Sequence, residues 1–198
     1  AYRRQRQMCI RDSLGNEMFL YHGSYCEVAV PDISKCAAHK DFGKGFYLTT
    51  SKEQAEKFIG TALKKAKSQG IISEEQEYGV VSTYCFTPTK KLNLHIFTEA
   101  DTEWLHCVVA HRKEGTFPEV RQQINQYDIV AGKIADDATN FTIVAYLSGV
   151  YGSIGSEEAD RFCISRLLPE RLKDQFCFRT ERAISCLNYV GSERIWRK

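Results

Sequence analysis

Two short apolar runs near the start of the chain have the pattern of β-strands. Residues 17–24 (EMFLYHGS) are largely apolar until they reach Gly-Ser, and residues 45–50 (GFYLTT) form a second run. Runs of this length that are rich in aromatic residues and bounded by turn-forming residues are typical of strands. Residues 25–42 carry a proline and have mixed polarity, so we predict a loop between the two strands.

The next segment, residues 51–70, has the pattern of an amphipathic helix. Ser51 followed by Gln54 has the spacing of a capping box, and Gly70 is a common residue at a helix end. Between them, apolar side chains recur at a spacing of three and four residues, which predicts one buried face. The members of this predicted face are Ala55, Phe58, Ile59 and Ala62.

The rest of the chain mixes strands and helices without an internal repeat. We predict strands over residues 77–88, 90–97, 126–134 and 174–180, and helices over residues 99–113, 138–150 and 157–167. Residues 181–190 fit either a short helix or a further strand segment. Strands that occur early, in the middle and late predict the α+β class. The length favours a single domain at 18–198, after an N-terminal extension at 1–17.

Composition narrows the class of protein. Apolar residues make up 43% and charged residues 26%, as in soluble globular proteins, and a net charge of +2 gives no strong electrostatic footprint for nucleic acid. The sequence has no run of about 18 apolar residues, so we expect no transmembrane helix and no membrane partner. No signal peptide is visible. We therefore expect a cytoplasmic protein, or one delivered to the cytosol of another cell, with secretion as the alternative.

Residues that often bind metals or form disulfides do not make a convincing set. The eight cysteines contain no Cys-x-x-Cys pair, and free thiols in a reducing cytosol are a simpler interpretation than disulfides in a secreted protein. His106 and His111 are poorly spaced for zinc, and His95 stands apart from them. The acidic segment 135–137 follows a predicted strand, where carboxylates more often cap a helix than hold a metal. We expect no metal.

The ends of the first two strands carry groups that suit a flat ligand. His22, Gly23 and Ser24 offer a polar ring, a bare backbone and a hydroxyl group, while Phe46 and Tyr47 follow a flexible Gly-Lys-Gly. Stacking on an aromatic ring plus a few hydrogen bonds is a common way to bind such a ligand. The alternative is purely structural, with a histidine at a strand end and two aromatic rings in the core.

These residues also resemble a known superfamily. LYHGS followed by FGKGFYLTTSKEQAEKF is similar to the NAD-binding half of the ADP-ribosyltransferase superfamily, closest to its diphtheria-toxin and poly(ADP-ribose) polymerase branch. The similarity extends over residues 18–190, where the layout also resembles a family of largely uncharacterised bacterial domains assigned to that superfamily. The resemblance implies a split β-sheet core with flanking helices, and NAD as the co-substrate.

The resemblance assigns roles in NAD binding to the matching positions. His22 would hydrogen-bond the adenosine ribose. The backbone of Gly23, next to Ser24, would bind the nicotinamide carboxamide, because a residue without Cβ lets the ligand approach closely. Tyr47 would stack on the nicotinamide ring, and Phe58 would close the other side of the sandwich.

Two further positions follow from the same comparison. Ala55 stands where the polymerase branch often has a serine that bonds the carboxamide, so that hydroxyl group is missing here. Lys44 lies between two glycines, where it would contact the NAD phosphates or simply remain solvated.

The third signature position departs from the branch. Gln175 falls where the resemblance places a glutamate, which stabilises the positive charge that builds on the ribose as the nicotinamide leaves. A glutamine can hold a ribose hydroxyl but supplies no charge. Asp174 would point to the opposite face of a regular strand, and Glu181 would lie about 20 Å away along an extended one. We therefore take Gln175 as the catalytic residue with His22 and Tyr47.

The expected function is that of an NAD-dependent mono-ADP-ribosyltransferase. The resemblance ties polymer formation to the glutamate that is replaced here, and it implies a toxin-like role with a possible inhibitory partner or antitoxin. The acceptor would be a macromolecule, with a protein as the first expectation and a nucleic acid as the alternative. The competing functions are an NAD or ADP-ribose binding module without turnover, and an NAD glycohydrolase.

Overall fold

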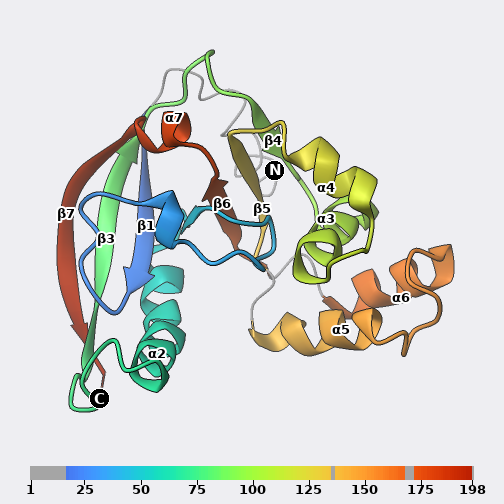
Figure 1. The fold of residues 1–198 in the computed structure, drawn as a ribbon, viewed down its shortest axis with the longest axis horizontal. Helices are drawn as coiled ribbons and strands as arrows, with labels where there is room; N and C mark the ends of the chain where they lie inside the picture. The colour runs from blue at the N-terminus through green and yellow to red at the C-terminus, as the bar shows by residue number, and fades with distance from the viewer. Residues whose placement is uncertain (1–16, 135–136, 168–171, 198) are drawn as a thin grey trace, which may run out of the picture.

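The described part of the chain, residues 17–134, 137–167 and 172–197 of a computed structural model, folds into two β-sheets flanked by helices (Figure 1). Sheet A is antiparallel, in the order β1-β3-β7, and its strands are β1 (Met18–Ser24), β3 (Tyr78–Phe86) and β7 (Leu187–Trp196). Sheet B has the order β2-β6-β5-β4, and its strands are β2 (Phe46–Leu48), β6 (Asp174–Phe178), β5 (Ile129–Lys133) and β4 (Leu94–Ile96).

The helices lie on both sides of the sheets, which confirms the α+β class. Helix α2 (Lys52–Ser68) packs on β1 and β3. Beyond sheet B, α3 (Thr102–Arg112) contacts α4 (Pro118–Ile124) and α6 (Glu157–Leu167), and α6 contacts α5 (Asp137–Leu147) (Figure 1). Two single turns, η1 (Ile33–Lys35) and α7 (Glu181–Ile184), lie in the connections.

The hydrophobic core has a part between the sheets, a part beyond sheet B and a part under α2. Between the sheets, Leu20 and Tyr84 of sheet A pack with Phe46, Phe176 and Phe178 of sheet B. Beyond sheet B, the core surrounds Trp104, which is fully buried as its place on a helix face predicts. The loop after β1 packs on two of these parts, because Val28, Ile33 and Cys36 contact the first and Phe42 is buried in the second.

The two sheets touch at one bridge and then separate. Tyr21 of β1 exchanges backbone hydrogen bonds with Thr49, which follows β2, at N···O distances of 2.9 and 3.0 Å. An antiparallel ladder continued from this pair would set Gly23 opposite Tyr47. That pair does not form, so the sheet is split at the two segments that the sequence identifies as ligand-binding candidates.

The structure confirms the predicted ends of helix α2 but only part of its predicted buried face. The Ser51 hydroxyl accepts a hydrogen bond from the Gln54 N–H at 3.3 Å, and Gly70 has φ +65°, the left-handed conformation of a helix end. Ala55 and Ile59 are buried as predicted. Phe58, by contrast, is 43% exposed, because the buried stripe is rotated toward Gly60, Leu63 and Ala66.

Most other predicted elements are present, with one helix added. The alternatives for residues 181–190 both hold in part, since α7 takes the first four residues and β7 begins at Leu187. Helix α4 was not predicted; it starts at Pro118, directly after Phe117 in a left-handed conformation. Strands β4 and β5 are parallel, joined through α3 and α4 without a glycine-rich loop.

Three further expectations from the sequence concern the cysteines, membrane-spanning helices and the N-terminal extension. The seven cysteines in the described residues are free thiols, and Cys107, Cys163 and Cys177 are buried. Within the same residues, no helix is long and apolar enough to cross a membrane. The predicted extension at 1–17 lies outside the described residues except for Glu17.

Candidate functional site

His22 bridges the point where β1 and β2 separate. Its Nδ1 lies 2.8 Å from the carbonyl oxygen of Tyr47, and its ring centroid is 4.4 Å from that of Phe46. A carbonyl oxygen only accepts hydrogen bonds, so Nδ1 carries the hydrogen and Nε2 of the neutral ring is an acceptor. Burial lowers the pKa of His22 below 6.5, although the bond to Tyr47 opposes the shift. His22 is therefore neutral near pH 7 and presents Nε2 as an acceptor.

The backbone of Gly23 faces the split. Its lack of a Cβ makes room for helix α2, whereas the sequence analysis expected it to make room for a ligand. Because Tyr21 directs its N–H and C=O to Thr49, those of Gly23 point the same way, away from β3. A Cβ on Gly23 would overlap the carbonyl oxygen of Ala55 and meet its carbonyl carbon at 2.9 Å. The absence of Cβ therefore lets helix α2 approach the strand, where the sequence-based argument required it for a ligand.

Tyr47 is held from within the protein by its hydroxyl group. The hydroxyl donates to the carbonyl oxygen of Gly43 at 2.8 Å and accepts from the N–H of Phe42 at 2.9 Å. Burial raises the pKa of Tyr47 well above its usual value, so the phenol stays neutral. The residue as a whole is partly exposed, and it packs against the core beyond sheet B. What Tyr47 offers a ligand is thus a fixed aromatic surface and not an acid or a base.

Gln175 lies on β6 beside the strand of Tyr47. Tyr47 is directly opposite Cys177 in the ladder, so Gln175, two residues before Cys177, is a diagonal neighbour of Tyr47 on the same face. The side-chain Nε2 of Gln175 donates to Asp41 Oδ2 at 2.8 Å and to the carbonyl oxygen of Lys133 at 3.2 Å. Gln175 is 8% exposed. The structure thus places the third signature position next to the second.

Asp41 is the residue of this site that the sequence analysis missed. Its Oδ1 accepts from Arg112 of α3, at 2.8 Å from Nε and 2.6 Å from Nη2, while Oδ2 accepts from Gln175. Arg112 also donates from Nη1 to Oδ1 of Asn140, on α5, at 2.8 Å. The available signal was a carboxylate just before the Gly-Lys-Gly segment, but its partners lie far away in sequence.

The two carboxylates considered near Gln175 have other roles. Asp174 Oδ1 pairs with Lys133 Nζ at 2.8 Å, and its side chain is 47% exposed. The strand argument for Glu181 was wrong, because β6 ends at Phe178 and Glu181 opens the helical turn α7. Asp174 is thus engaged by Lys133, and Glu181 is not the strand residue that the sequence argument assumed.

The other predicted contacts are spread around this core of the site. Ser24 is buried at the end of β1, and Lys44 is exposed between Gly43 and Gly45. Lys40 Nζ lies over the ring of Phe58, 5.7 Å from its centroid. Since Asp41 reaches β6 and Lys40 reaches α2, this loop segment spans the distance between the two elements.

The metal-binding candidates do not assemble. Among the described residues, no three His, Cys, Asp or Glu side chains are placed to share a metal ion. His106 Nε2 pairs with Asp160 at 2.7 Å, and Nδ1 of the buried His111 bonds the Cys107 carbonyl oxygen at 2.8 Å. The side chains of the acidic segment 135–137 lie outside the described residues.

Cys36, in the loop after β1, is not placed to react as a nucleophile. Burial raises the pKa of its thiol, so little of the reactive thiolate is present near neutral pH.

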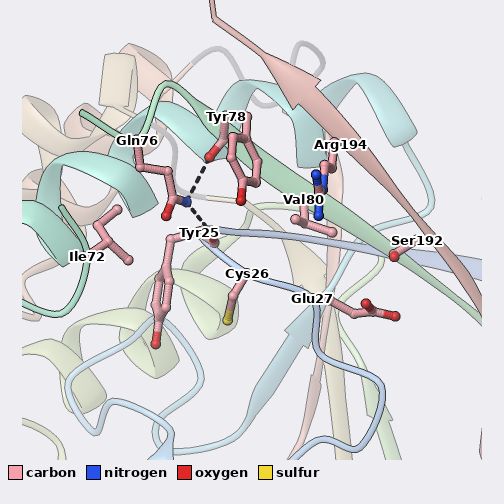
Figure 2. A pocket seen from close by; sticks show the side chains of 9 residues that line it. All are labelled: Tyr25, Cys26, Glu27, Ile72, Gln76, Tyr78, Val80, Ser192 and Arg194. Atoms are coloured by element: carbon pink, nitrogen blue, oxygen red, sulfur yellow. Dashed lines mark hydrogen bonds between the residues drawn. The ribbon is translucent and has the colours of Figure 1, made fainter. Parts of the chain in front are cut away.

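Two hollows in the surface lie away from these residues. One, of about 460 Å³, is shown in Figure 2, where the Gln76 side chain hydrogen-bonds the carbonyl oxygens of Tyr25 and Tyr78. The other, of about 720 Å³, lies beside His106 and Asp160. Neither is lined by His22, Tyr47 or Gln175. The Tyr47 hydroxyl and the Gln175 amide are instead held by Asp41, Phe42 and Gly43 of the protein's own loop.

The described residues thus form an α+β protein in which the His22 ring bonds the backbone of Tyr47 and Gln175 is the diagonal neighbour of Tyr47. The chain belongs to the family described as a protein of unknown function (DUF3990), whose model matches residues 18–189. No curated protein matches the chain.

Proposed function

We propose that the protein is an NAD-dependent mono-ADP-ribosyltransferase whose site lies where β1 and β2 separate. The observation that carries the proposal is the hydrogen bond of the His22 ring to the backbone carbonyl of Tyr47 across the split, with Gln175 diagonal to Tyr47 on the next strand. These are the three positions that the resemblance assigns to the reaction. They come from segments far apart in the sequence, so their meeting is not a consequence of local structure.

The backbone of the split suits the nicotinamide carboxamide. An amide ligand offers one donor pair and one acceptor, which match the C=O and N–H of Gly23 that point away from β3. Ala55 lies directly against Gly23, in the position where the polymerase branch often has a serine. With alanine there, the ligand would rely on the backbone alone for its carboxamide hydrogen bonds.

The rings suit a stacked ligand. Tyr47 keeps its orientation through its hydroxyl group and is partly exposed, and a fixed aromatic ring is a common platform for a flat heterocycle. Phe58 would form the opposite wall. Because Lys40 now lies over the ring of Phe58, we expect bound NAD to displace the ammonium group of Lys40.

The reaction breaks the bond between nicotinamide and ribose. Nicotinamide leaves with the bonding electron pair, positive charge builds on the ribose, and an acceptor atom forms the new bond as it loses its proton to solvent. Gln175 would accept a hydrogen bond from a ribose hydroxyl, and Nε2 of His22 would accept one from the adenosine ribose. A protein side chain remains our first proposal for the acceptor, since the net charge of +2 gives little attraction for nucleic acid.

Nicotinamide release by the purified protein, measured beside calorimetric NAD binding, tests the proposal. Binding with release, and labelled ADP-ribose transferred to protein in a lysate, would support the transferase. Release with no labelled acceptor would favour the glycohydrolase, and binding without release in the presence of lysate would favour an NAD sensor. No binding would refute the NAD site itself.

A further inference from the structure

The orientation of the Gln175 amide is fixed by two acceptors. Nε2 is within hydrogen-bond distance of Asp41 Oδ2 and of the Lys133 carbonyl oxygen, and neither of these oxygens can donate. Both amide hydrogens are thereby engaged, and the amide cannot be turned over without placing an oxygen against two oxygens. Both hydrogen bonds of the Gln175 side chain to the described residues are made by Nε2 and none by Oε1, and the residue keeps 8% of its surface exposed. Oε1 is therefore the atom that Gln175 offers to a ligand.

Asp41 is a buried carboxylate that is paired with an arginine. It is 7% exposed, and Arg112 holds its Oδ1 with two hydrogen bonds. A buried carboxylate costs free energy unless it is paired and hydrogen-bonded, so the Arg112 contact stabilises it in this position. Arg112 and Gln175 both donate to Asp41, from opposite sides of the carboxylate. The negative carboxylate polarises the Gln175 amide that donates to it, so Gln175 Oε1 gains negative character.

We propose that Asp41 is the positioning residue for Gln175, so that the negative charge that the His-Tyr-Glu signature carries on its third residue lies here on the residue behind it. In that signature a glutamate meets the ribose directly. Here Gln175 meets it, and the negative charge lies one hydrogen bond behind, on Asp41. This inference rests on the proposed function, because the ribose of NAD is the group that Gln175 would contact.

The arrangement accounts for a glutamine in this position. As the bond to nicotinamide breaks, the positive charge on the ribose is stabilised by any negative charge that is already oriented toward it. Gln175 Oε1 holds the ribose hydroxyl, and Asp41 keeps that oxygen directed outward through its hydrogen bond to Nε2. A glutamate at position 175 would instead put a second carboxylate within about 3 Å of Asp41, where the two charges repel each other.

The place of the negative charge can be tested by exchanging the residues. Asp41→Asn removes the charge and lets the Gln175 amide turn over. Gln175→Glu creates the repelling pair, and the double variant Asp41→Asn/Gln175→Glu restores one amide and one carboxylate in reversed order. The steady-state kcat for nicotinamide release and the calorimetric Kd for NAD are measured for all four proteins, with the melting temperature and circular dichroism of each.

We expect Asp41→Asn to lower kcat by about 10- to 100-fold, the usual scale for removing a partner that orients a reacting group. The Kd for NAD should change by less than about threefold, because Asp41 does not touch the ligand. Gln175→Glu should lose at least as much kcat, and the double variant should recover at least about tenfold over Gln175→Glu. A merely structural role would move the melting temperature but not kcat per folded molecule.

Asp41→Ser serves if Asp41→Asn does not fold, since it removes the same charge and should lower kcat equally. Glu181→Gln is the control, an exposed carboxylate on α7 whose replacement should change neither kcat nor Kd. An active wild type with an unchanged kcat in Asp41→Asn or Asp41→Ser would overturn the inference alone. So would a double variant no better than Gln175→Glu. A wild type that neither binds NAD nor releases nicotinamide would refute the proposed function first.

Discussion

At the scale of single residues, Tyr47 divides its contacts between the protein and the proposed ligand. Its hydroxyl group bonds Phe42 and Gly43, while the residue as a whole remains partly exposed. The two functions can be separated by substitution, because phenylalanine keeps the ring and alanine removes it. A tyrosine that was only a core residue would show no such separation in a binding measurement.

We predict that Tyr47→Ala weakens NAD binding by about 1–3 kcal/mol, the scale of a lost aromatic stack. Tyr47→Phe should keep the affinity within a few-fold and lose about 1 kcal/mol of folding stability, because the two hydroxyl contacts are lost. Calorimetric titration and urea denaturation measure the two effects. Equal NAD affinity in wild type and a folded Tyr47→Ala protein would remove Tyr47 from the site.

The neutral state of His22 predicts a pH dependence. Burial lowers its pKa below 6.5, so between 6.5 and that lowered value the unfolded chain binds a proton that the folded chain does not. The stability that this residue contributes is therefore complete above pH 6.5 and decreases as the pH falls below it. NAD affinity should likewise stay constant from about pH 8 to the ordinary histidine pKa, and weaken in more acidic solution as Nε2 gains a proton.

Calorimetric titrations at several pH values measure this dependence, with His22→Asn as the variant that cannot titrate. The variant should bind NAD more weakly than wild type at neutral pH and lack the decrease in acid. A wild-type affinity that already falls between about pH 8 and 7 would show that His22 titrates at or above its ordinary pKa.

The sequence identified His22, Tyr47 and Gln175 but not what holds them. Their residue types and order are visible in one dimension, so a resemblance was enough to select them. The tautomer of His22 depends on the Tyr47 carbonyl oxygen, and the orientation of Gln175 depends on Asp41, far earlier in the chain. Contacts of this kind follow from how the loop after β1 folds back, which no local pattern encodes.

At the scale of elements, the contact between β1 and α2 determines how close the helix comes to the split. A Cβ at Gly23 would overlap the backbone of Ala55. Ala55 is in the first turns of α2, whose position also brings Phe58 near Lys40. The distance between strand and helix therefore controls the width of the proposed nicotinamide site.

We predict that Gly23→Ala lowers the free energy of unfolding by about 1–3 kcal/mol, because the added methyl group meets backbone atoms that cannot rotate away. Urea denaturation measures the change. Phe19→Ala, on the same strand at a side chain that is 53% exposed, is the control and should cost less than about 0.5 kcal/mol. If Gly23→Ala costs no more than the control, the close packing of α2 on β1 is wrong.

Elements with strong local signals were predictable, and those defined by tertiary contacts were not. Helix α2 begins at a serine cap and ends at a glycine, and both signals are local. The buried face was only partly predicted, since Phe58 is apolar yet lies at the edge of the stripe. Residues 181–190 read equally as helix or strand, because the switch from α7 to β7 depends on pairing with β3.

At the scale of the whole molecule, Asp128 ties sheet B to the segment that crosses to sheet A. Its carboxylate accepts from the N–H of Asn93, before β4, at 2.8 Å. It also accepts from Thr180 at 2.8 Å and from Arg182 at 2.6 Å, at the turn α7 that leads to β7 (Figure 1). Burial alone would raise the pKa of Asp128, but these hydrogen bonds together lower it below 3.8.

The direction of the pKa shift of Asp128 determines the pH range in which its hydrogen bonds stabilise the fold. A carboxylate whose folded pKa is depressed adds stability above its unfolded pKa and loses it as the pH falls through the folded value. We predict that Asp128→Asn lowers the free energy of unfolding by about 1–3 kcal/mol at neutral pH, since its amide group would face the donors of Thr180 and Arg182. Wild type and variant should converge as the pH falls below 3.8.

Urea denaturation at a series of pH values measures this convergence, with Asp174→Asn as the control for a carboxylate that is half exposed. The control should lose much less stability at every pH, because water can replace its contact with Lys133. A cost for Asp128→Asn that stayed constant into acid would mean that the contribution comes from shape and not from charge. The junction between the sheets, and with it the split that holds the proposed site, would then depend on packing alone.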